Sequence, residues 1–170
     1  QLCRTFRHYL DDDDEYGLKV DLKYKIDGKN FEKSFTPNDP LYLMTPNSCP
    51  DFENKATNKL IEQTDLTIPY VDYKGEPTTT KVKATFSVAL PSFQRDFGKN
   101  KPQGKHYGKN TGISVVRRAR EIDFGNFGFF DGNEARERWW GCEIRFEPEL
   151  DELFGLTNNK QNANKFYFEN

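Results

Sequence analysis

The sequence predicts an α+β domain in which a single β-sheet carries helices on one face. Several segments alternate apolar and polar residues with the period of two that is typical of strands. Segments with helical spacing are few and short. Neither an internal repeat nor a break in composition divides the 170 residues, and this length corresponds to about one domain of roughly 100–200 residues.

Composition excludes several classes of protein. Hydrophobic residues make up 35% of the chain, aromatic residues 15%, and the formal net charge is −2, which together favour a folded chain over a disordered one. The balance of 25 basic and 27 acidic residues argues against a dedicated nucleic-acid-binding domain. No segment approaches the roughly 18 apolar residues of a membrane span, and no signal peptide is visible. We therefore expect a cytoplasmic location and no membrane partner.

The cysteines and the first residue indicate the context of the chain. Cys3, Cys49 and Cys142 are odd in number and far apart, so they form neither a disulfide framework nor a zinc-binding pattern. We expect three free thiols. The chain begins with Gln1 rather than Met, and we expect it to be a piece of a longer protein.

The first third of the chain predicts a helix and a hairpin. Residues 3–10 have helical spacing, with Phe6, Tyr9 and Leu10 on one face, and an acidic run at 11–15 then predicts a solvated loop. Residues 18–36 predict a hairpin: residues 18–26 alternate apolar and polar side chains, Asp27-Gly28 is a strong signal for a two-residue turn, and Phe31 and Phe35 belong to the returning strand.

The middle of the chain predicts connections, strands and one further helix. Four prolines within residues 37–59 predict a long connection over the surface. The best additional helix candidate is residues 48–64, through Phe52, Ala56, Leu60 and Ile61. Strands are expected at 66–73 and 81–90, the second stopped by Pro91.

The last third predicts a glycine-rich loop, three strands and a short helix. Residues 98–112 contain four glycines and predict a flexible loop. Residues 113–116 and 121–124 predict a strand that turns and returns, and residues 139–146 predict the last strand. Pro148 suits the first position of a helical turn over 148–154 and Gly155 its C-terminal cap.

The sequence contains no self-contained active site. It lacks the nucleophile-elbow, zinc-protease and P-loop motifs, and His8 and His106 have no cysteine at metal-ligand spacing, so we predict neither catalytic residues nor a metal site in this fragment. The acidic residues near 147–152 are expected to favour the positive end of a helix dipole. Of Trp139 and Trp140, which cannot share a strand face, one is expected in the core, while the other could lie at an interface or pack against loops.

Two basic segments are candidates for anion or nucleic-acid binding. The glycine-rich loop could hold phosphate through its amides and ammonium groups, and the turn at 117–120 could contact nucleic acid or a neighbouring domain. In both segments, solvated charge is the alternative interpretation. The residues concerned are Lys99, Lys101, Lys105, Lys109, Arg117, Arg118 and Arg120.

Three segments resemble a bacterial family of GHKL-type ATPases. They are GISVVRRAREIDF at 112–124, RERWWGCEIRFEPELDELFGLTNNKQ at 136–161 and PNDPLYLMTPN at 37–47. This superfamily includes the gyrase B subunit, the MutL mismatch-repair protein, the heat-shock chaperone of ninety kilodaltons and histidine kinases. The resemblance is to the second domain, the transducer, and CRTFRHYL at 3–10 is similar to the helix that joins it to the ATP-binding domain.

The resemblance implies a domain organisation and a fold. Residues 1–16 would end the linker helix from a missing N-terminal ATP-binding domain, and residues 17–170 would form the transducer. The family's transducer is an α+β sheet with helices on one face, related to domain two of ribosomal protein S five.

The resemblance also implies a site. Lys160 would reach the γ-phosphate of ATP in the neighbouring domain, with Gln161 beside it and Asn158 and Asn159 shaping the loop. ATP and Mg²⁺ would be bound mainly by the missing domain of the full-length protein, which would form an ATP-dependent homodimer. The fragment alone would be an inactive, non-catalytic transducer, and the alternative is an α+β module that binds nucleic acid or protein through its Lys/Arg-rich loop and strand.

Overall fold

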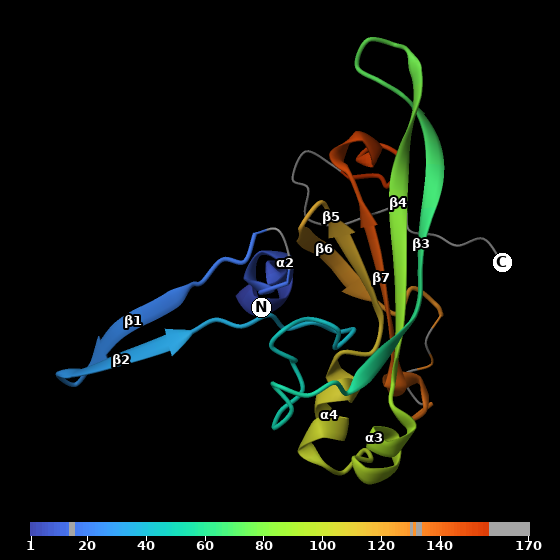
Figure 1. The fold of residues 1–170 in the computed structure, drawn as a ribbon. Helices are drawn as coiled ribbons and strands as arrows, with labels where there is room; N and C mark the ends of the chain where they lie inside the picture. Colours follow the sequence, from blue (N-terminus) through green and yellow to red (C-terminus); the bar gives the residue numbers. More distant parts are fainter. Residues whose placement is uncertain (14–15, 130, 132–133, 157–170) are drawn as a thin grey trace.

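The computed structural model describes residues 1–13, 16–129, 131 and 134–156, and it confirms the α+β class (Figure 1). The strands are β1 (Asp21–Ile26), β2 (Lys29–Ser34), β3 (Asn58–Val71), β4 (Pro77–Ala89), β5 (Ile113–Arg117), β6 (Arg120–Gly125) and β7 (Trp140–Phe146). The helices are α1 (Leu2–Thr5), α2 (Arg7–Leu10), α3 (Pro91–Asp96) and α4 (Pro102–Lys109), with the 3₁₀ turns η1 (Glu137–Trp139) and η2 (Pro148–Leu150).

The main sheet has five strands in the order β3-β4-β7-β5-β6. All neighbouring pairs are antiparallel except β5 and β7, which run parallel. The strands expected at 66–73, 81–90, 113–116, 121–124 and 139–146 all belong to this sheet, so these predictions are confirmed. The return between β5 and β6 is a tight turn in which Arg118 has a positive φ of 59°.

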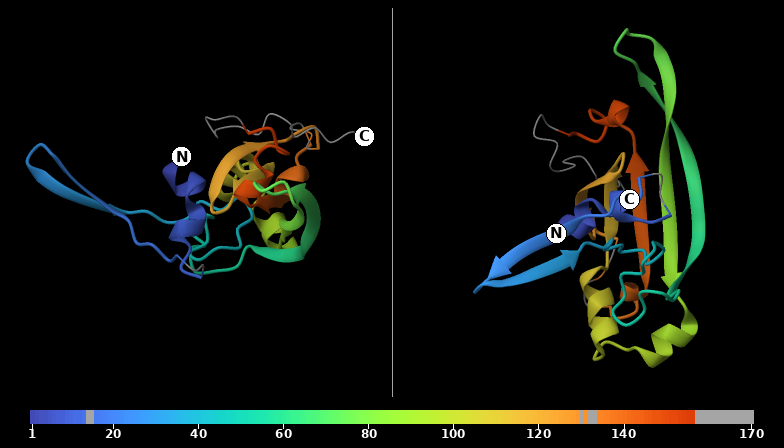
Figure 2. Two further views of the ribbon diagram at one scale, coloured as in Figure 1. Left: turned by 90° about the horizontal axis from the view of Figure 1, so that it is seen from above. Right: turned by 60° about the vertical axis from the view of Figure 1, so that its left-hand side comes forward.

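The hairpin expected at 18–36 forms a second sheet of its own, β1–β2. Asp27 and Gly28 connect its strands with φ values of 49° and 80°, as a type I′ turn requires. Every residue of both strands is exposed. The hairpin extends away from the rest of the molecule in all three ribbon views (Figures 1 and 2).

The prediction of a helix at residues 48–64 is wrong. Residues 49–56 form turns, and β3 begins at Asn58. Leu60 and Ile61, which belong to the spacing that predicted this helix, are exposed on the edge strand β3. Pairing of β3 with β4 from Asn58 onward overrides the weak helical spacing, because propensity yields to tertiary contacts.

The connection at 37–59 is not a surface segment throughout. Leu41 and Tyr42 are each 3% exposed, and Cys49 is fully buried. Tyr42 stacks on Tyr107 of α4 with ring centroids 3.9 Å apart, and Phe93 of α3 joins the same cluster. This segment therefore contributes part of the core.

The flexible loop expected at 98–112 is also wrong in its central part, because residues 102–109 form α4. Pro102 occupies the first turn, where its missing N–H costs nothing. Gly104 packs so closely on the backbone of Gly98 that a Cβ would not fit. Tertiary packing thus offsets the low helix propensity of two glycines.

The two faces of the sheet are covered differently. One face is apolar, with a core of Val82, Val115, Ile122, Phe146 and Leu150. Neighbouring strand residues point to opposite faces, so Ser114 and Glu143 lie on the other face, where α1 and α2 pack. α3 and α4 lie at one end of the sheet (Figure 1).

The cysteines are unpaired and the tryptophans pack within the chain. All three cysteines are free thiols, as expected. Trp139 packs on Tyr107 with centroids 5.3 Å apart, and Trp140 packs against the cluster of Ile113 and Cys142. Both tryptophans are half-buried, so each contributes to packing within the chain.

Candidate functional site

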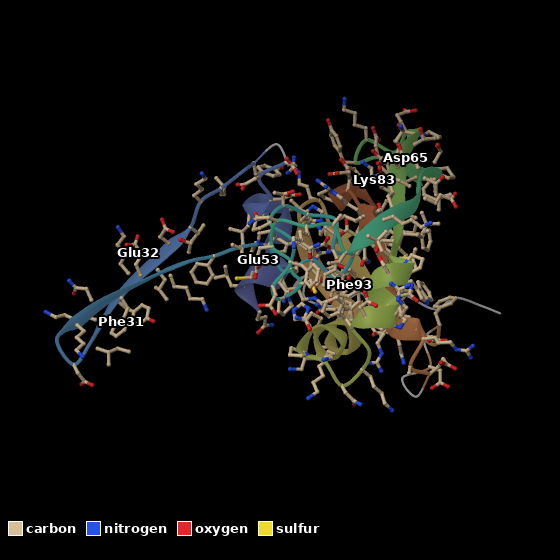
Figure 3. The ribbon with its side chains drawn as sticks, turned by 60° about the horizontal axis from the view of Figure 1, so that its bottom comes forward. Phe31, Glu32, Glu53, Asp65, Lys83 and Phe93 are labelled. Carbon is tan, nitrogen blue, oxygen red and sulfur yellow. The ribbon has the colours of Figure 1, made fainter. Side chains whose placement is uncertain are left out.

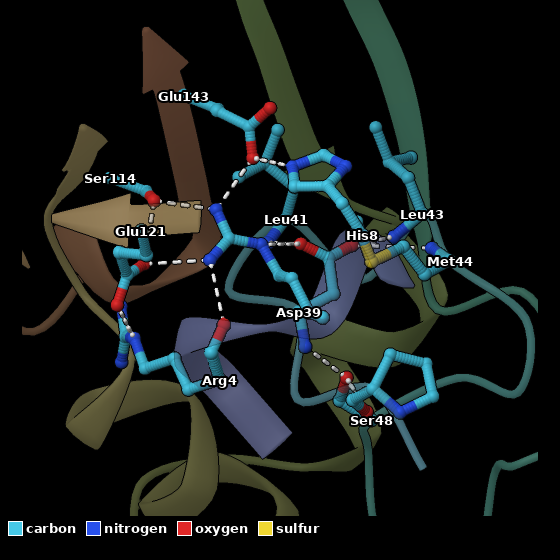
Figure 4. Close-up of polar contacts among 12 residues, drawn as sticks. Arg4, His8, Asp39, Leu41, Leu43, Met44, Ser48, Ser114, Glu121 and Glu143 are labelled. Atoms are coloured by element: carbon cyan, nitrogen blue, oxygen red, sulfur yellow. Dashed lines mark hydrogen bonds and ion pairs between the residues drawn. The ribbon is translucent and has the colours of Figure 1, made fainter. Parts of the chain in front are cut away.

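A buried set of charged side chains joins the N-terminal helices to the sheet (Figure 4). We call it the Arg7 cluster, and its members come from α1, α2, the segment after β2, and strands β5, β6 and β7. They are Arg4, Arg7, His8, Asp39, Ser114, Glu121 and Glu143.

Arg7 is the centre of the cluster, and its side chain is fully buried. Its Nη2 lies 2.6 Å from Oε2 of Glu143 and its Nη1 lies 2.8 Å from Oε2 of Glu121. Its Nε lies 3.8 Å from Oδ1 of Asp39. The Ser114 hydroxyl accepts from Arg7 and donates to Glu121 over 2.6 Å. The guanidinium is therefore surrounded by three carboxylates, as a buried cation requires.

Short-range sequence relations place these side chains. Arg4, Arg7 and His8 have the i, i+3, i+4 spacing of one helical side, although the helix is interrupted at Phe6. Ser114 and Glu143 lie directly opposite each other on β5 and β7. The helical spacing of Arg4, Arg7 and His8 and the strand pairing of Ser114 with Glu143 thus bring these side chains together at one point of the sheet.

Arg4 and His8 extend the cluster. Arg4 Nε lies 2.8 Å from Oε1 of Glu121, and the guanidinium of Arg4 lies 3.4 Å from the centre of the Phe124 ring, a cation–π contact. His8 Nε2 lies 3.1 Å from Oε2 of Glu143. Both contacts tie the N-terminal helices to the strands.

Asp39 orders the chain that covers the cluster. Its carboxylate accepts backbone N–H bonds from Leu41 at 2.9 Å, Leu43 at 2.7 Å and Met44 at 3.2 Å. An aspartate that binds the amides after it forms a local turn without regular structure. The Asp39 carboxylate therefore connects the segment 37–47 to Arg7.

The charges shift one another's pKa values. Burial on its own would raise the pKa of Glu143, but the Arg7 charge and the hydrogen bonds from His8 and Arg7 outweigh it and lower the pKa to about 2. Burial also raises the pKa of Asp39, which the charge of Arg7 only partly offsets. Arg7 and Glu143 are thus both charged at neutral pH. The cluster therefore attaches α2 to the sheet through buried ion pairs.

The sequence reasoning did not find this cluster. Its members are distributed from residue 4 to residue 143, and in the sequence each polar side chain taken alone is expected to be exposed to solvent. The available signal was the apolar Val116, which shares a strand face with Ser114 and so indicates that this face is covered as well.

A second feature is the turn that follows β7. Arg117 at the end of β5 makes two bonds to Asp151, at 2.6 and 2.9 Å, and the rings of Phe146 and Phe154 stack at 4.0 Å. The helical turns expected at 148–154 are confirmed as η2 and the turn after it, with Gly155 at a positive φ of 65°. Asp151 is held by an arginine rather than by a helix dipole alone.

The predicted phosphate-binding residues follow this turn directly. Asn158, Asn159, Lys160 and Gln161 lie outside the described residues. The described part of the segment ends at Leu156, whose N–H donates to the Asp151 carbonyl at 2.8 Å. The predicted loop therefore begins at a point attached to both β5 and β7.

The basic residues do not gather on one surface. Lys99, Lys101, Lys105 and Lys109 are exposed in α4 or just before it, at one end of β5, and the arginines lie at the other end (Figure 1). Four residue steps of a strand separate these ends by about 13 Å.

The arginines at 117–120 also have partners of their own. Arg117 binds Asp151, Arg118 Nε lies 3.9 Å from a Glu147 carboxylate oxygen, and the Arg120 guanidinium lies 5.7 Å from the Phe6 ring centre. The charge of Arg117 is therefore balanced within the chain, whereas Arg118 has only an exposed acidic neighbour and Arg120 an aromatic one.

Fold and site together define an α+β protein whose N-terminal helices are joined to a mixed sheet through buried charges. A scan against protein-family models, a search of curated proteins and a search of solved structures each found no significant match. Within the described residues, no helix is long and apolar enough to cross a bilayer, and no group of three or more His, Cys, Asp or Glu side chains could hold a metal ion.

Proposed function

We propose that this chain is the non-catalytic transducer domain of a cytoplasmic GHKL-type ATPase. In this proposal Lys160 contributes a positive charge to the ATP site of a preceding domain, with Gln161, Asn158 and Asn159 forming its loop. The S five-like relation of the fold and the ATP-dependent homodimer belong to the same proposal. ATP and Mg²⁺ would be bound mainly by the preceding domain.

A transducer relays the state of the nucleotide between the helix that leads to the ATP-binding domain and the loop that carries Lys160. The observation that carries the proposal is that β7 contacts both the N-terminal helices and the turn before this loop. Glu143 in β7 binds Arg7 and His8 of the helix that would lead to the ATP-binding domain. Phe146, three residues further along β7, stacks on Phe154 in the turn that leads to the Lys160 loop. One strand therefore couples the two segments that a transducer must move together.

The chemistry of the switch is electrostatic. A lysine on a loop acts as a point charge that can reach a phosphate, and charge-assisted contacts of this kind are worth about 1.5–3 kcal/mol. With ATP bound, this contact would order the loop, and hydrolysis would remove it. A domain can rotate between two such states only if the nucleotides bind them with different free energies.

The test is ATP turnover by a longer form of the protein that includes the proposed ATP-binding domain. We expect Lys160→Ala to reduce turnover and ATP-induced dimerisation strongly, because the γ-phosphate loses its cation. Lys165→Ala is the matched control, since it removes an equal charge five residues further along. Unchanged turnover and dimerisation in Lys160→Ala would contradict the proposed role of Lys160. A longer wild-type protein without any turnover would contradict the family assignment.

The alternative, a nucleic-acid-binding module, receives less support from the geometry. Its candidate residues separate into two groups at opposite ends of β5, and two of the three arginines, Arg117 and Arg118, lie near the carboxylates of Asp151 and Glu147. A phosphate backbone is bound best by a continuous basic surface. The transducer function is therefore the better-supported of the two.

A further inference from the structure

The hairpin β1–β2 has one face on which apolar side chains and lysines lie together. Directly opposite residues of an antiparallel pair share a face, and so do residues two apart along a strand. The rings of Tyr24 and Phe31 stack at the centre of this face, 5.3 Å apart, and Phe31 and Glu32 project to opposite sides of the hairpin (Figure 3). The face is formed by the opposite pairs Leu22 with Lys33, Tyr24 with Phe31, and Ile26 with Lys29.

This apolar face is open to solvent along its whole length. The exposed fractions of Leu22, Tyr24, Ile26 and Phe31 are 46%, 40%, 53% and 42%. A two-stranded hairpin is at best marginally stable alone in water, and contiguous exposed apolar patches mark interaction sites. The face is therefore a surface that a partner would stabilise.

The charges of the two strands are sorted between the faces of the hairpin. Within β1 and β2, the charged side chains on the apolar face are Lys29 and Lys33, one on each side of Phe31. The acidic side chains lie on the opposite face, where Lys23 pairs with Glu32 at 3.3 Å and Ser34 donates to Asp21 at 2.7 Å. The apolar face thus carries positive charge that its own strands do not balance, and this favours an acidic partner.

The outer edge of β2 can accept a further strand. β1 and β2 pair only with each other in the described part of the chain. The N–H of Phe35 donates to the carbonyl of Val20 at 2.9 Å, and antiparallel pairs alternate between hydrogen-bonded and non-hydrogen-bonded ones. The backbone groups that point to the outer edge are therefore those of Asn30, Glu32 and Ser34. An exposed edge of this kind is a template for an extended segment of a partner.

We propose that the outer edge of β2 binds an extended segment of another protein in which two acidic residues flank an apolar one, in the pattern acid–x–apolar–x–acid. The apolar residue packs beside Phe31, and the two carboxylates pair with Lys29 and Lys33. Residues on one face of a strand recur every 7 Å or so, about the same distance in both strands, so the three positions of the partner align with those of β2. This binding does not depend on the proposed transducer function.

Other occupants fit this surface less well. If β2 paired antiparallel with β2 of a second copy around Phe31, Lys29 would lie beside Lys33, and like charges across a strand pair are destabilising. The hydrocarbon of a lipid bilayer cannot satisfy the backbone groups at the outer edge. Nucleic acid bases stack on aromatic rings, which Leu22 and Ile26 do not offer. An acidic, partly apolar protein segment matches the charge, the apolar side chains and the open edge together.

Fluorescence anisotropy of a labelled peptide, Thr-Glu-Thr-Val-Thr-Glu-Thr, titrated with the whole chain tests the proposal. The control peptide, Glu-Thr-Thr-Val-Thr-Thr-Glu, has the same composition, but as a strand it places its carboxylates on the face opposite the valine. We expect the control to bind roughly tenfold more weakly, because it lacks the charge-assisted contacts with the lysines. If the first peptide does not bind at up to about 1 mM protein, where affinity is already very low, or if the two peptides bind equally, the proposal is overturned.

Charge substitutions in the hairpin locate the contact. Lys33→Glu should weaken binding of the first peptide roughly tenfold or more, whereas Lys25→Glu makes the same change on the polar face, opposite Asn30, and should have little effect. Equal effects of these two variants would contradict the proposed contact.

An exchange of charges guards against simple loss of the hairpin structure. The double variant Lys29→Glu, Lys33→Glu should bind Thr-Lys-Thr-Val-Thr-Lys-Thr in place of the acidic peptide. An unfolded hairpin cannot acquire this specificity, so its absence contradicts the proposal. Vesicles of anionic phospholipid, or single-stranded oligothymidine, that bind more tightly than the acidic peptide and lose this binding in Lys33→Glu would show a different occupant, and would also overturn the proposal.

Discussion

At the scale of single residues, Arg7 determines how the N-terminal helices attach to the sheet. Moving a guanidinium out of water costs several kcal/mol, and here Glu143, Glu121 and Asp39 offset that cost. The three carboxylates would in turn repel one another without the cation. The charges of the cluster therefore depend on one another, and removing one member leaves the remaining buried charges only partly compensated.

Glu143 provides the pH-dependent test of this cluster. Its pKa falls from an ordinary value of 4.5 to about 2 on folding, so its contribution to stability is complete above pH 4.5 and disappears as the pH falls toward 2. We expect Glu143→Gln to lower the free energy of unfolding by about 2–3 kcal/mol at pH 7, somewhat less than the loss of a whole buried ion-pair partner, because Arg7 keeps Glu121.

Urea unfolding at a series of pH values measures this difference. The gap between wild type and Glu143→Gln should shrink as the pH falls below 4.5. Asp39, whose pKa burial raises, contributes with the opposite sign, and because the charge of Glu143 raises that pKa further, Asp39 also adds to the pH dependence of the gap. Glu32→Gln, in an exposed pair with Lys23, should cost no more than about 0.5 kcal/mol at any pH. A gap that stays constant down to pH 2 would contradict the ionic role of Glu143.

At the scale of elements, the two glycines of α4 have different roles. Gly104 lies against the carbonyl of Gly98, where an added Cβ would collide with backbone, whereas a Cβ at Gly108 would meet only the Arg138 side chain at 3.6 Å. We expect Gly104→Ala to destabilise the protein by about 1–3 kcal/mol through overpacking. Gly108→Ala should stabilise it by about 0.5–1 kcal/mol, because alanine has the higher helix propensity.

Thermal or urea unfolding of these two variants tests the packing of α4. Each is the control for the other, since both make the same chemical change in one helix. If residues 98–112 were instead a flexible loop, the two substitutions would have similar small effects. Equal values of the unfolding free energy would thus argue against α4 and for the loop that its composition predicts.

Local signals explain which elements the sequence could predict. Both short hairpins were predictable, because alternation and turn residues such as Asp27-Gly28 act over a few neighbouring positions. α4 was not, because its stability comes from contacts with distant residues such as Tyr42 that outweigh its glycines. The Arg7 cluster was not predictable for the same reason, since Asp39 and Glu143 meet Arg7 only after the sheet has formed.

At the scale of the whole molecule, the hairpin β1–β2 and the rest of the chain are separable. β1 and β2 contact mainly each other, whereas α1 and α2 are fixed to the sheet by buried charges. The N–H of Phe35 donates to the carbonyl of Val20 at 2.9 Å, so the two ends of the hairpin are already adjacent. The segment between them can be replaced without moving its attachment points.

We therefore expect that replacing residues 21–34 by Asn-Gly, a two-residue turn suited to such ends, leaves the five-stranded sheet intact. The free energy of unfolding should change by no more than about 0.5 kcal/mol. A loss of several kcal/mol would mean that the hairpin supports the fold of the body. The experiment therefore distinguishes a hairpin that supports the five-stranded sheet from one that is only attached to it.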